Sequence, residues 1–314
     1  MRLRLIPVAL LITLLFLTAG CRPGEANKNE IRIGYQKFGV LSILKARGSL
    51  EKRFESQGVR VKWVQFPAGP QLLEALHAGS IDIGETGNTP PIFAQAAGTP
   101  LVYIGAGKPR PEAEAIVVHH DSPIHDIGQL KGKKIALNKG SNVHYLLLKV
   151  LEKAGLSYSD IQPVYLPPAD AKAAFIRKSV DAWVIWDPYF ADAQTDLNVR
   201  ILTDAKGYTS NRSYYFSSKD FAQENPDKIQ ILLDELQKSA EWFNQNPDQT
   251  AKLLAEQIGM DLKPVDIAIR RAKYGIEPVS PDIVQDQQQI ARAFHETGLI
   301  PQSVQVRDVI WSPK

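Results

Sequence analysis

Short apolar runs alternate with amphipathic segments along the first third of the chain. Four runs rich in Ile, Val, Leu and Tyr predict β-strands, at 31–35, 59–66, 81–85 and 100–106. Between them lie three segments with apolar residues at helical spacing or prolines at a helix start, and these predict helices within 39–58, 70–80 and 89–98. Strands that alternate with helices in this way predict a parallel sheet covered by helices.

A second set of alternating elements begins near residue 115. Its predicted strands are 115–119, 134–138, 161–166, 180–186 and 199–204, and its predicted helices lie within 136–156 and 169–178. A strand at 213–218 precedes long helical segments at 219–246, 248–259 and 281–297.

The two sets of elements predict an α/β fold of two lobes, each a mixed, mostly parallel sheet flanked by helices. Residues 31–115 and 213–314 would form lobe I, and residues 116–212 would form lobe II. The chain would cross between the lobes near 115–118 and 212–218. Two such crossings form a natural hinge.

The N-terminus has the pattern of a secretory signal. Arg2 and Arg4 precede an uncharged stretch over 5–19, which is too short and too early in the chain for a stable membrane span. The segment LTAGC (17–21) resembles a lipobox, which predicts removal of residues 1–20 and lipidation of Cys21. The alternative is ordinary secretion with an unrelated cysteine.

The cellular location of the protein is predicted from residues 1–30. Residues 21–30, CRPGEANKNE, are polar and contain Pro and Gly, so they read as a flexible stalk. We expect a periplasmic protein that meets the membrane only through the lipid on Cys21, or a soluble periplasmic protein if the lipobox is not used. Cys21 is the only cysteine, so a disulfide within the folded body is excluded.

The charge balance argues against a nucleic-acid partner. The chain has 37 basic and 34 acidic residues, and removal of residues 1–20 takes away Arg2 and Arg4 and no acid, which leaves 35 against 34. Proteins that bind nucleic acid normally present a basic face, and a near-neutral chain is not typical of them.

Six segments, in order and at matching spacing, resemble the periplasmic aliphatic sulfonate-binding proteins of ABC importers. They are 32–37, 66–98, 130–156, 160–175, 180–189 and 299–311. The resemblance implies a type II periplasmic binding-protein fold with the ligand in the cleft between the lobes. It also implies a monomer with no cofactor, whose partners are a small-molecule anion, an aliphatic sulfonate, and a membrane permease of an ABC transporter.

A sulfonate has three oxygens and one negative charge that no physiological pH removes, so its site needs hydrogen-bond donors. In NKGSNVH (138–144), Gly140 lets the backbone approach closely, Ser141 begins a helix, and Asn142 and His144 add polar groups. The helix N-terminus favours an anion. The alternative is a plain helix cap at the surface.

A second strand-to-helix turn lies in IDIGETGNTPPIF (81–93). Thr86, Gly87 and Asn88 turn into a helix begun by two prolines, and the donors at Gly87, Asn88 and Thr89 are free to point outward. The alternative is a turn that serves only the topology. Glu85 departs from the family pattern, and a carboxylate repels an anion. We therefore expect Glu85 to point away from the sulfonate or to meet a cationic part of the ligand.

Three further candidates follow strands. Gln36 lies just past the first strand, where ligands of open α/β sheets bind. In VDAWVIWDPY (180–189), Trp183 is expected in the core, Trp186 beside the ligand, and Asp187 as the residue that orients a donor or closes the cleft. Loop exposure and a buried strand are the alternative interpretations.

An enzyme and a metal site are both disfavoured. The chain has no G-x-x-x-x-G-K-[ST] loop and no G-x-S-x-G turn, which removes two common catalytic arrangements. The histidines of HHDSPIH (119–125) lack the helical spacing or the cysteine partners of a metal site. Within the same fold, taurine, nitrate, bicarbonate and a thiamine-precursor pyrimidine remain alternative ligands.

Overall fold

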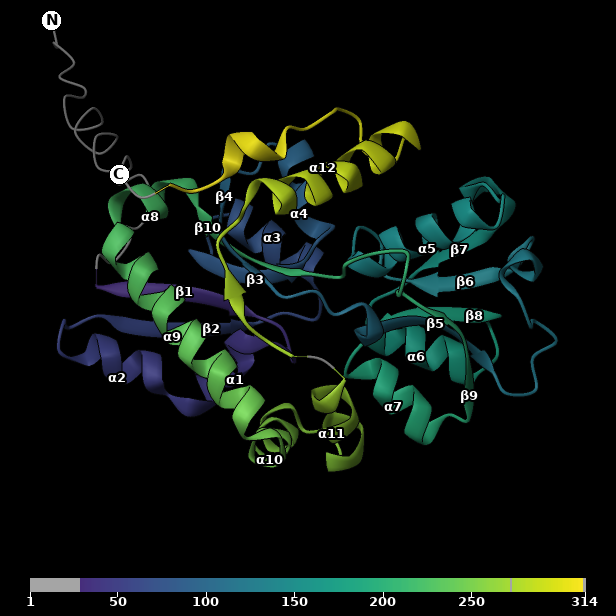
Figure 1. Ribbon diagram of the computed structural model, residues 1–314, viewed down its shortest axis with the longest axis horizontal. Helices are drawn as coiled ribbons and strands as arrows, with labels where there is room; N and C mark the ends of the chain where they lie inside the picture. Colours follow the sequence, from purple (N-terminus) through teal and green to yellow (C-terminus); the bar gives the residue numbers. More distant parts are fainter. Residues whose placement is uncertain (1–28, 272, 313–314) are drawn as a thin grey trace, which may run out of the picture.

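Two β-sheets lie beside each other, and helices flank each of them (Figure 1). The computed structural model describes residues 29–271 and 273–312. The predicted signal peptide (1–20), Cys21 and most of the stalk predicted at 21–30 lie outside the described residues. The two-lobed, mixed α/β architecture predicted from the sequence is confirmed.

The first sheet has the strand order β11-β4-β10-β3-β1-β2. Strands β1 to β4 share one direction, whereas β10 runs antiparallel between β3 and β4. The bounds are β1 Glu30–Tyr35, β2 Arg60–Gln65, β3 Ile83–Gly87, β4 Leu101–Gly107, β10 Ser213–Ser218 and β11 Ile276–Glu277. The antiparallel strand β10 agrees with the predicted mixed, mostly parallel sheet, and it returns from the second sheet rather than through a helical crossover.

Helices cover both faces of the first sheet. One face packs against α1 Val40–Arg47, α2 Ser49–Glu55, α9 Pro226–Gln245, α10 Pro247–Ile258 and α11 Leu262–Arg270. The other packs against α3 Gly69–His77, α4 Pro90–Ala96 and α12 Pro281–Glu296. The short helix α8 Lys219–Glu224 follows β10 directly. Alternating strand residues supply the apolar side chains of both cores.

The second sheet has the order β7-β6-β8-β5-β9, in which only β5 runs against its neighbours. Its strands are β5 Glu114–His119, β6 Lys134–Leu137, β7 Gln162–Tyr165, β8 Ala182–Trp186 and β9 Val199–Asp204. The helix α5 Asn142–Lys153 covers one face, and α6 Pro168–Ile176 and α7 Tyr189–Asp196 cover the other. Trp183 is fully buried, as predicted.

Backbone chemistry divides two segments that the pattern predicts as continuous helices. Gly48 has φ +61° and separates α1 from α2, because this left-handed conformation ends a helix and suits glycine. Asn225 has non-helical dihedrals directly before Pro226, and it separates α8 from α9.

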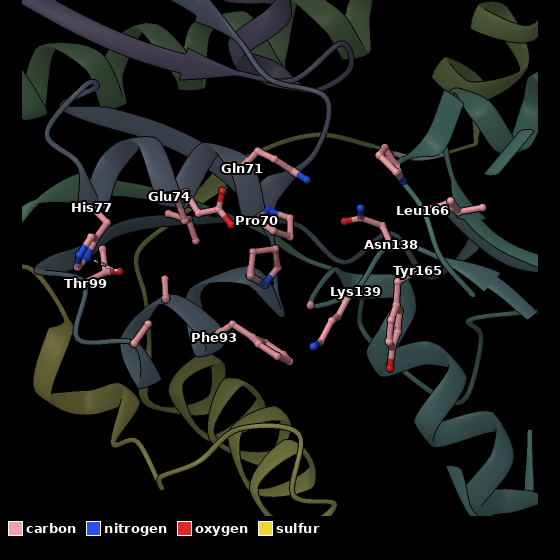
Figure 2. A pocket seen from close by; sticks show the side chains of 16 residues that line it. Pro70, Gln71, Glu74, His77, Phe93, Thr99, Asn138, Lys139, Tyr165 and Leu166 are labelled. Atoms are coloured by element: carbon pink, nitrogen blue, oxygen red, sulfur yellow. Dashed lines mark hydrogen bonds between the residues drawn. The ribbon is translucent and has the colours of Figure 1, made fainter. Parts of the chain in front are cut away.

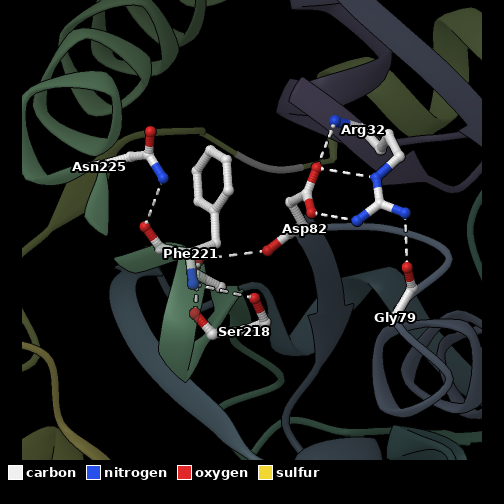
Figure 3. A network of polar contacts seen from close by, with 7 residues as sticks. Arg32, Gly79, Asp82, Ser218, Phe221 and Asn225 are labelled. Carbon is white, nitrogen blue, oxygen red and sulfur yellow. Dashed lines mark hydrogen bonds and ion pairs between the residues drawn. The ribbon is translucent and has the colours of Figure 1, made fainter. Parts of the chain in front are cut away.

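A partly buried ion pair connects neighbouring strands at one end of the first sheet (Figure 3). Arg32 on β1 donates from its side chain to both carboxylate oxygens of Asp82 and to the carbonyl of Gly79 (2.5 Å). The carbonyl of Asp82 accepts from the N–H of Ser218, whose hydroxyl caps α8. These bonds join β1, the residue just before β3 and the last residue of β10. They lie at the end of the sheet that is remote from the crossings between the lobes.

The chain passes between the sheets over 108–113, from β4 to β5, and over 205–212, from β9 to β10. The first passage therefore precedes the predicted crossing at 115–118, which lies inside β5. The lobe boundaries assigned from the sequence stay a prediction. No helix within residues 29–271 and 273–312 has the length and apolar character needed to span a membrane.

Candidate ligand site between the lobes

A cavity of about 50 Å³ lies between the two sheets, where several strands end and the chain crosses. One water needs about 10–15 Å³ of such volume, so the cavity has room for a small polar group. Both lobes and both crossing segments contribute to its lining, which consists of Gln36, Phe38, Glu85, Gly87, Arg110, Ala113, Asn142, Trp186, Asp187, Asn211 and Ser213.

Arg110 brings a positive charge to this cavity from the first crossing segment. Its guanidinium donates to the hydroxyl of Ser213 (2.5 Å) and lies over the ring of Tyr274, 4.7 Å from the ring centroid. Its backbone carbonyl accepts from the side chain of Asn211 (2.9 Å) on the second crossing segment. An arginine is charged at every physiological pH and offers planar donors suited to oxyanions.

Glu85 also lines the cavity. Its carboxylate accepts from the N–H of Leu41 (3.2 Å), in the first turn of α1. Burial raises the pKa of Glu85, while Arg110 and the Leu41 N–H oppose that shift. Gly39, with φ +137°, is required here because an added Cβ would lie 2.8 Å from a carboxylate oxygen of Glu85. Glu85 therefore faces the cavity, and its charge is partly balanced from within the protein.

Glu114 lies behind the cavity and is fully buried. Its carboxylate accepts from the amide of Asn142 at the start of α5 and from the hydroxyl of Thr209 (2.9 Å). Burial raises the pKa of Glu114 to about 7, although these two hydrogen bonds and the charge of Arg110 act in the opposite direction. The carboxyl of Glu114 is thus poised to gain or lose a proton near neutral pH.

Asp187 links the cavity to the C-terminal part of the chain. Both of its carboxylate oxygens accept from Arg271, at 2.8 and 2.9 Å, and one also accepts from the N–H of Ala191 in α7. Burial raises the pKa of Asp187 to about 6, against the effect of Arg271. Arg271, which directly follows α11, also donates to Gln194 and lies over the ring of Phe190 (4.2 Å). It therefore contacts the second lobe through Asp187, Gln194 and Phe190.

The N-termini of α4 and α5 face each other across the interface between the lobes. A Cβ added to Gly87 would lie 3.0 Å from the side chain of Asn142, and one added to Gly140 would lie 3.5 Å from the ring of Phe93. The two helix starts predicted to converge on one anion are therefore in contact in this structure, because glycine leaves room for the approach.

Five residues predicted as ligand-binding lie together at the cavity, namely Gln36, Gly87, Asn142, Trp186 and Asp187. The side chain of Gln36 donates to the carbonyl of Glu85 (3.1 Å), which holds the ends of β1 and β3 together. The structure does not test their contact with a ligand, and their binding roles stay predictions.

The other predicted residues lie elsewhere. The hydroxyl of Thr86 donates to the carbonyl of Gly87 (2.9 Å), and that of Ser141 donates to the carbonyl of Asn138 (2.7 Å). Ser141 is the N-cap residue of α5 but makes no side-chain capping bond. The two hydroxyls therefore satisfy carbonyls within their own turns.

Asn88 and His144 are also turned inward. The carbonyl of Asn88 accepts from the side chain of Gln287, and its amide oxygen accepts from Thr89 (3.1 Å). His144 accepts from the N–H of Gly140 (3.2 Å) and lies among aromatic rings. Burial lowers the pKa of His144 to about 3, with Lys139 contributing in the same direction, so this imidazole is neutral and adds no positive charge for an anion. Gly140 itself lines a larger neighbouring groove.

Four residues in or next to the crossing segments were not predicted from the sequence: Arg110, Glu114, Asn211 and Ser213. The usable signal was Arg110 between two prolines in KPRPE (108–112), a few residues before the crossing predicted at 115–118. In the described part of the chain, no group of three or more His, Cys, Asp or Glu residues has the arrangement of a metal site.

Two lobes joined by two crossings, with a polar cavity between them, define the class of periplasmic binding proteins. Residues 53–250 match the family model described as NMT1/THI5 like. The chain is 43% identical over 291 residues to the putative aliphatic sulfonates-binding protein of Escherichia coli (strain K12), with 92% of this chain and 91% of that protein covered.

Two further comparisons agree. The putative aliphatic sulfonates-binding protein of Bacillus subtilis (strain 168) is 35% identical over 313 residues, which cover 96% of this chain and 92% of that protein. The solved structure of the alkanesulfonate-binding protein SsuA from Xanthomonas axonopodis pv. citri, bound to MOPS, has 39% identity and a TM-score of 0.87, with 91% and 99% of the two chains covered. The chain belongs to the family of aliphatic sulfonate-binding proteins. These relatives are binding proteins and not enzymes.

Proposed function

We propose that this protein captures aliphatic sulfonates in the periplasm and delivers them to the membrane permease of an ABC importer. The observation that carries the proposal is the cavity between the lobes, in which Arg110 and the facing N-termini of α4 and α5 meet. The family relationship supports the same ligand class.

The site has the chemistry that a sulfonate requires. The guanidinium of Arg110 and the amides of Gln36 and Asn142 are donors from different elements, and the two helix N-termini add backbone N–H groups and favourable dipoles. Phe38 and Trp186 supply apolar surface beside them. A tailless anion such as nitrate makes no use of this apolar surface, so a sulfonate with a carbon tail is the better match.

Capture proceeds by closure of the lobes. In an open state each lobe presents part of the donor set, and the ligand bridges the two parts. It favours the closed state by the difference between its affinities for the two states. The closed form then docks on the permease. The protein itself is proposed to act as a monomer, held to the membrane by a lipid on Cys21 after removal of residues 1–20.

One observation favours an aminosulfonate such as taurine as a second candidate. Glu85 faces the cavity, and a carboxylate there is suited to an ammonium group on the ligand. An unsubstituted alkanesulfonate has no ammonium group, and the charge of the Glu85 carboxylate is then balanced by Arg110.

Calorimetric titration with butanesulfonate, taurine, nitrate and sulfate tests the proposal. The buffer must be free of sulfonates, since MOPS is itself a sulfonate and is bound in the related structure. We expect butanesulfonate to bind, and Arg110→Gln to weaken it at least tenfold, because hydrogen bonds to a charged group contribute about 1.5–3 kcal/mol each. Binding of nitrate alone, or full retention of affinity in Arg110→Gln, would contradict the assignment.

A further inference from the structure

The side-chain amide of Asn142 is held in one orientation by two acceptors of the protein. Its nitrogen donates to the carboxylate of Glu114 and to the amide oxygen of Asn211 (3.3 Å). The oxygen of Asn211 is available for this bond, because the amide nitrogen of Asn211 donates to the carbonyl of Arg110 (2.9 Å). Both N–H donors of the Asn142 amide are therefore engaged within the protein.

The amide oxygen of Asn142 lies toward Gly87 instead. A Cβ added to Gly87 would be 3.0 Å from this oxygen, and both residues line the cavity. An amide oxygen accepts hydrogen bonds and donates none, and the same is true of a sulfonate oxygen. An anion beside Gly87 therefore meets an oxygen of Asn142 unless the amide turns over.

We propose that capture of the anion turns over the amide of Asn142 and adds one proton to Glu114. After the turn, the nitrogen of Asn142 donates to the anion and its oxygen faces Glu114. Two oxygens with no hydrogen between them repel, so the carboxylate of Glu114 takes a proton from the solvent and donates its new O–H to Asn142. Release of the anion reverses both changes.

The inference rests on the proposed function, since the anion is the sulfonate of the same site. Glu114 does not line the cavity, and it acts on the anion through Asn142. It is therefore a positioning residue that links the affinity for the anion to pH.

Burial already brings Glu114 close to protonation. It raises the pKa of this fully buried carboxyl to about 7, against the hydrogen bonds from Thr209 and Asn142 and the charge of Arg110. When the Asn142 amide turns over, one of these opposing hydrogen bonds is lost, and the bound anion adds a negative charge nearby. Both changes raise the pKa of Glu114 further, so anion and proton bind together.

The other two carboxyl groups at the cavity are less suited to take up this proton. The largest effect that opposes burial is the charge of Arg110 for Glu85 and the charge of Arg271 for Asp187. A nearby positive charge favours a carboxylate that stays ionised. For Glu114 the largest opposing effects are hydrogen bonds from neutral groups, which depend on how those groups are oriented.

The remaining ionisable groups near the site are neutral. Tyr215 and Tyr274 face Arg110, and burial raises the pKa of both phenols above the ordinary value of 10. Burial lowers the pKa of His144, on the same helix as Asn142, to about 3. None of these three groups adds a charge to the site near neutral pH.

The larger groove lined by Gly140 is a separate space. It shares no lining residue with the cavity. Its ionisable side chains come from α3 and from the segment after β6 (Figure 2), and they are Glu74, His77 and Lys139. The charge that acts on the pKa of Glu114 is that of Arg110 instead.

Calorimetric titration of butanesulfonate at pH 8 measures the proton uptake. The titration is done in Tris and in triethanolamine, two sulfonate-free buffers with different heats of ionisation. A sulfonate does not titrate, and an exposed histidine is mainly neutral at this pH, so the proton belongs to a carboxyl group. We expect the unchanged protein to take up about 0.5–1 proton per anion, and its Kd to rise at least about fivefold between pH 7 and 8.5.

Glu114→Gln replaces the protonated carboxyl by an amide, which can donate to Asn142 at every pH. This variant should take up no proton, and at pH 8.5 it should bind butanesulfonate at least about fivefold more tightly than the unchanged protein. The control Glu112→Gln changes a partly exposed carboxylate that pairs with Lys206 (3.3 Å), and it should keep both the uptake and the pH dependence. Circular dichroism melting shows that each variant is folded.

Asn142→Leu removes the amide that turns over. It should weaken butanesulfonate at least about tenfold, because a hydrogen bond to a charged group is lost, and it should take up less than about half as much proton. Infrared difference spectra of the unchanged protein need no variant, and binding should add the carbonyl band of a protonated carboxylic acid.

Three results would overturn the inference while the proposed function stands. They are equal binding heats in the two buffers with a constant Kd from pH 7 to 8.5, undiminished proton uptake in Asn142→Leu, and no new carboxylic acid band. Failure of every sulfonate to bind would overturn the proposed function as well.

Discussion

Charged side chains gather around Arg110 at an unusual density for a buried site. Glu85, Glu114 and Asp187 are each no more than 6% exposed, and the positive charges near them are Arg110 and Arg271. Removing carboxylates from water is costly, and burial raises the pKa of all three groups. Protonation of one carboxyl relieves that cost, and it would also remove a negative charge from a site that we propose binds an anion.

The raised pKa of Glu114 makes the stability of the protein depend on pH. Its pKa rises from 4.5 to about 7 on folding, so the folded protein holds a proton over this range that the unfolded chain has released. Stability therefore falls as the pH rises from about 5 to 8, by up to about 3 kcal/mol from this group. We expect Glu114→Gln to flatten the dependence of the unfolding free energy on pH, measured by urea denaturation.

The matched control is Glu112→Gln, whose side chain is 38% exposed and two residues away. It should leave the pH dependence as it is. Burial also raises the pKa of Glu85 and of Asp187, so the difference between the curves of Glu114→Gln and the unchanged protein, and not the slope of either, measures the contribution of Glu114. Parallel curves for Glu114→Gln and the unchanged protein would show that Glu114 does not hold the proton.

Side-chain direction limited what could be predicted residue by residue. Gln36 and Trp186 were found because they follow strands, and strand ends meet at one edge of a sheet. Ser141 and Thr86 have the right position in their turns, but their hydroxyls satisfy local carbonyls, which spacing alone does not reveal. Arg110 was missed because its place at the cavity depends on how two distant crossing segments pack.

At the scale of elements, α11 connects the two lobes. This helix packs against α10 of the first lobe and α7 of the second. The ion pair between Arg271 and Asp187 is largely hidden from solvent, with side chains 13% and 2% exposed. Such a pair is sensitive to the loss of one partner, since the other charge is then left buried.

Arg271→Ala should shift the ligand-free protein toward the open state. The closed state would bury Asp187 without its partner, whereas an open state lets water reach it. We expect a larger radius of gyration in small-angle X-ray scattering and an affinity for butanesulfonate lower by about tenfold, equivalent to about 1.4 kcal/mol.

Arg270→Ala is the control for this helix end. Arg270 pairs with the exposed Asp248 of α10 and the half-buried Asp266 of α11, and neither contact crosses to the second lobe. Its replacement should leave scattering and affinity unchanged. Equal effects of Arg270→Ala and Arg271→Ala would show that helix stability, and not the contact between lobes, explains the result.

Elements with strong periodicity were predicted, and weak ones were missed. Strands such as β1 and β8 have compact apolar runs with clear limits, and α5 and α12 have apolar positions at helical spacing. The helix α7 was not predicted because YFADAQTD is short and mixes small and polar residues. Its packing under the second sheet, rather than its own pattern, stabilises it.

At the scale of the whole molecule, we propose that the two crossing segments serve as both hinge and binding site. Arg110 lies on one segment and Asn211 on the other, and a hydrogen bond joins them. A movement of one lobe relative to the other therefore changes the positions of residues that line the cavity. This arrangement explains how a single anion between the lobes can favour closure of the entire protein.

A crystal structure with butanesulfonate tests this account most directly. We predict that the sulfonate oxygens lie within about 3 Å of the guanidinium of Arg110, beside Gly87 and Asn142, with the lobes closed around them. A head group bound remote from Arg110 and from both helix N-termini would contradict the central claim.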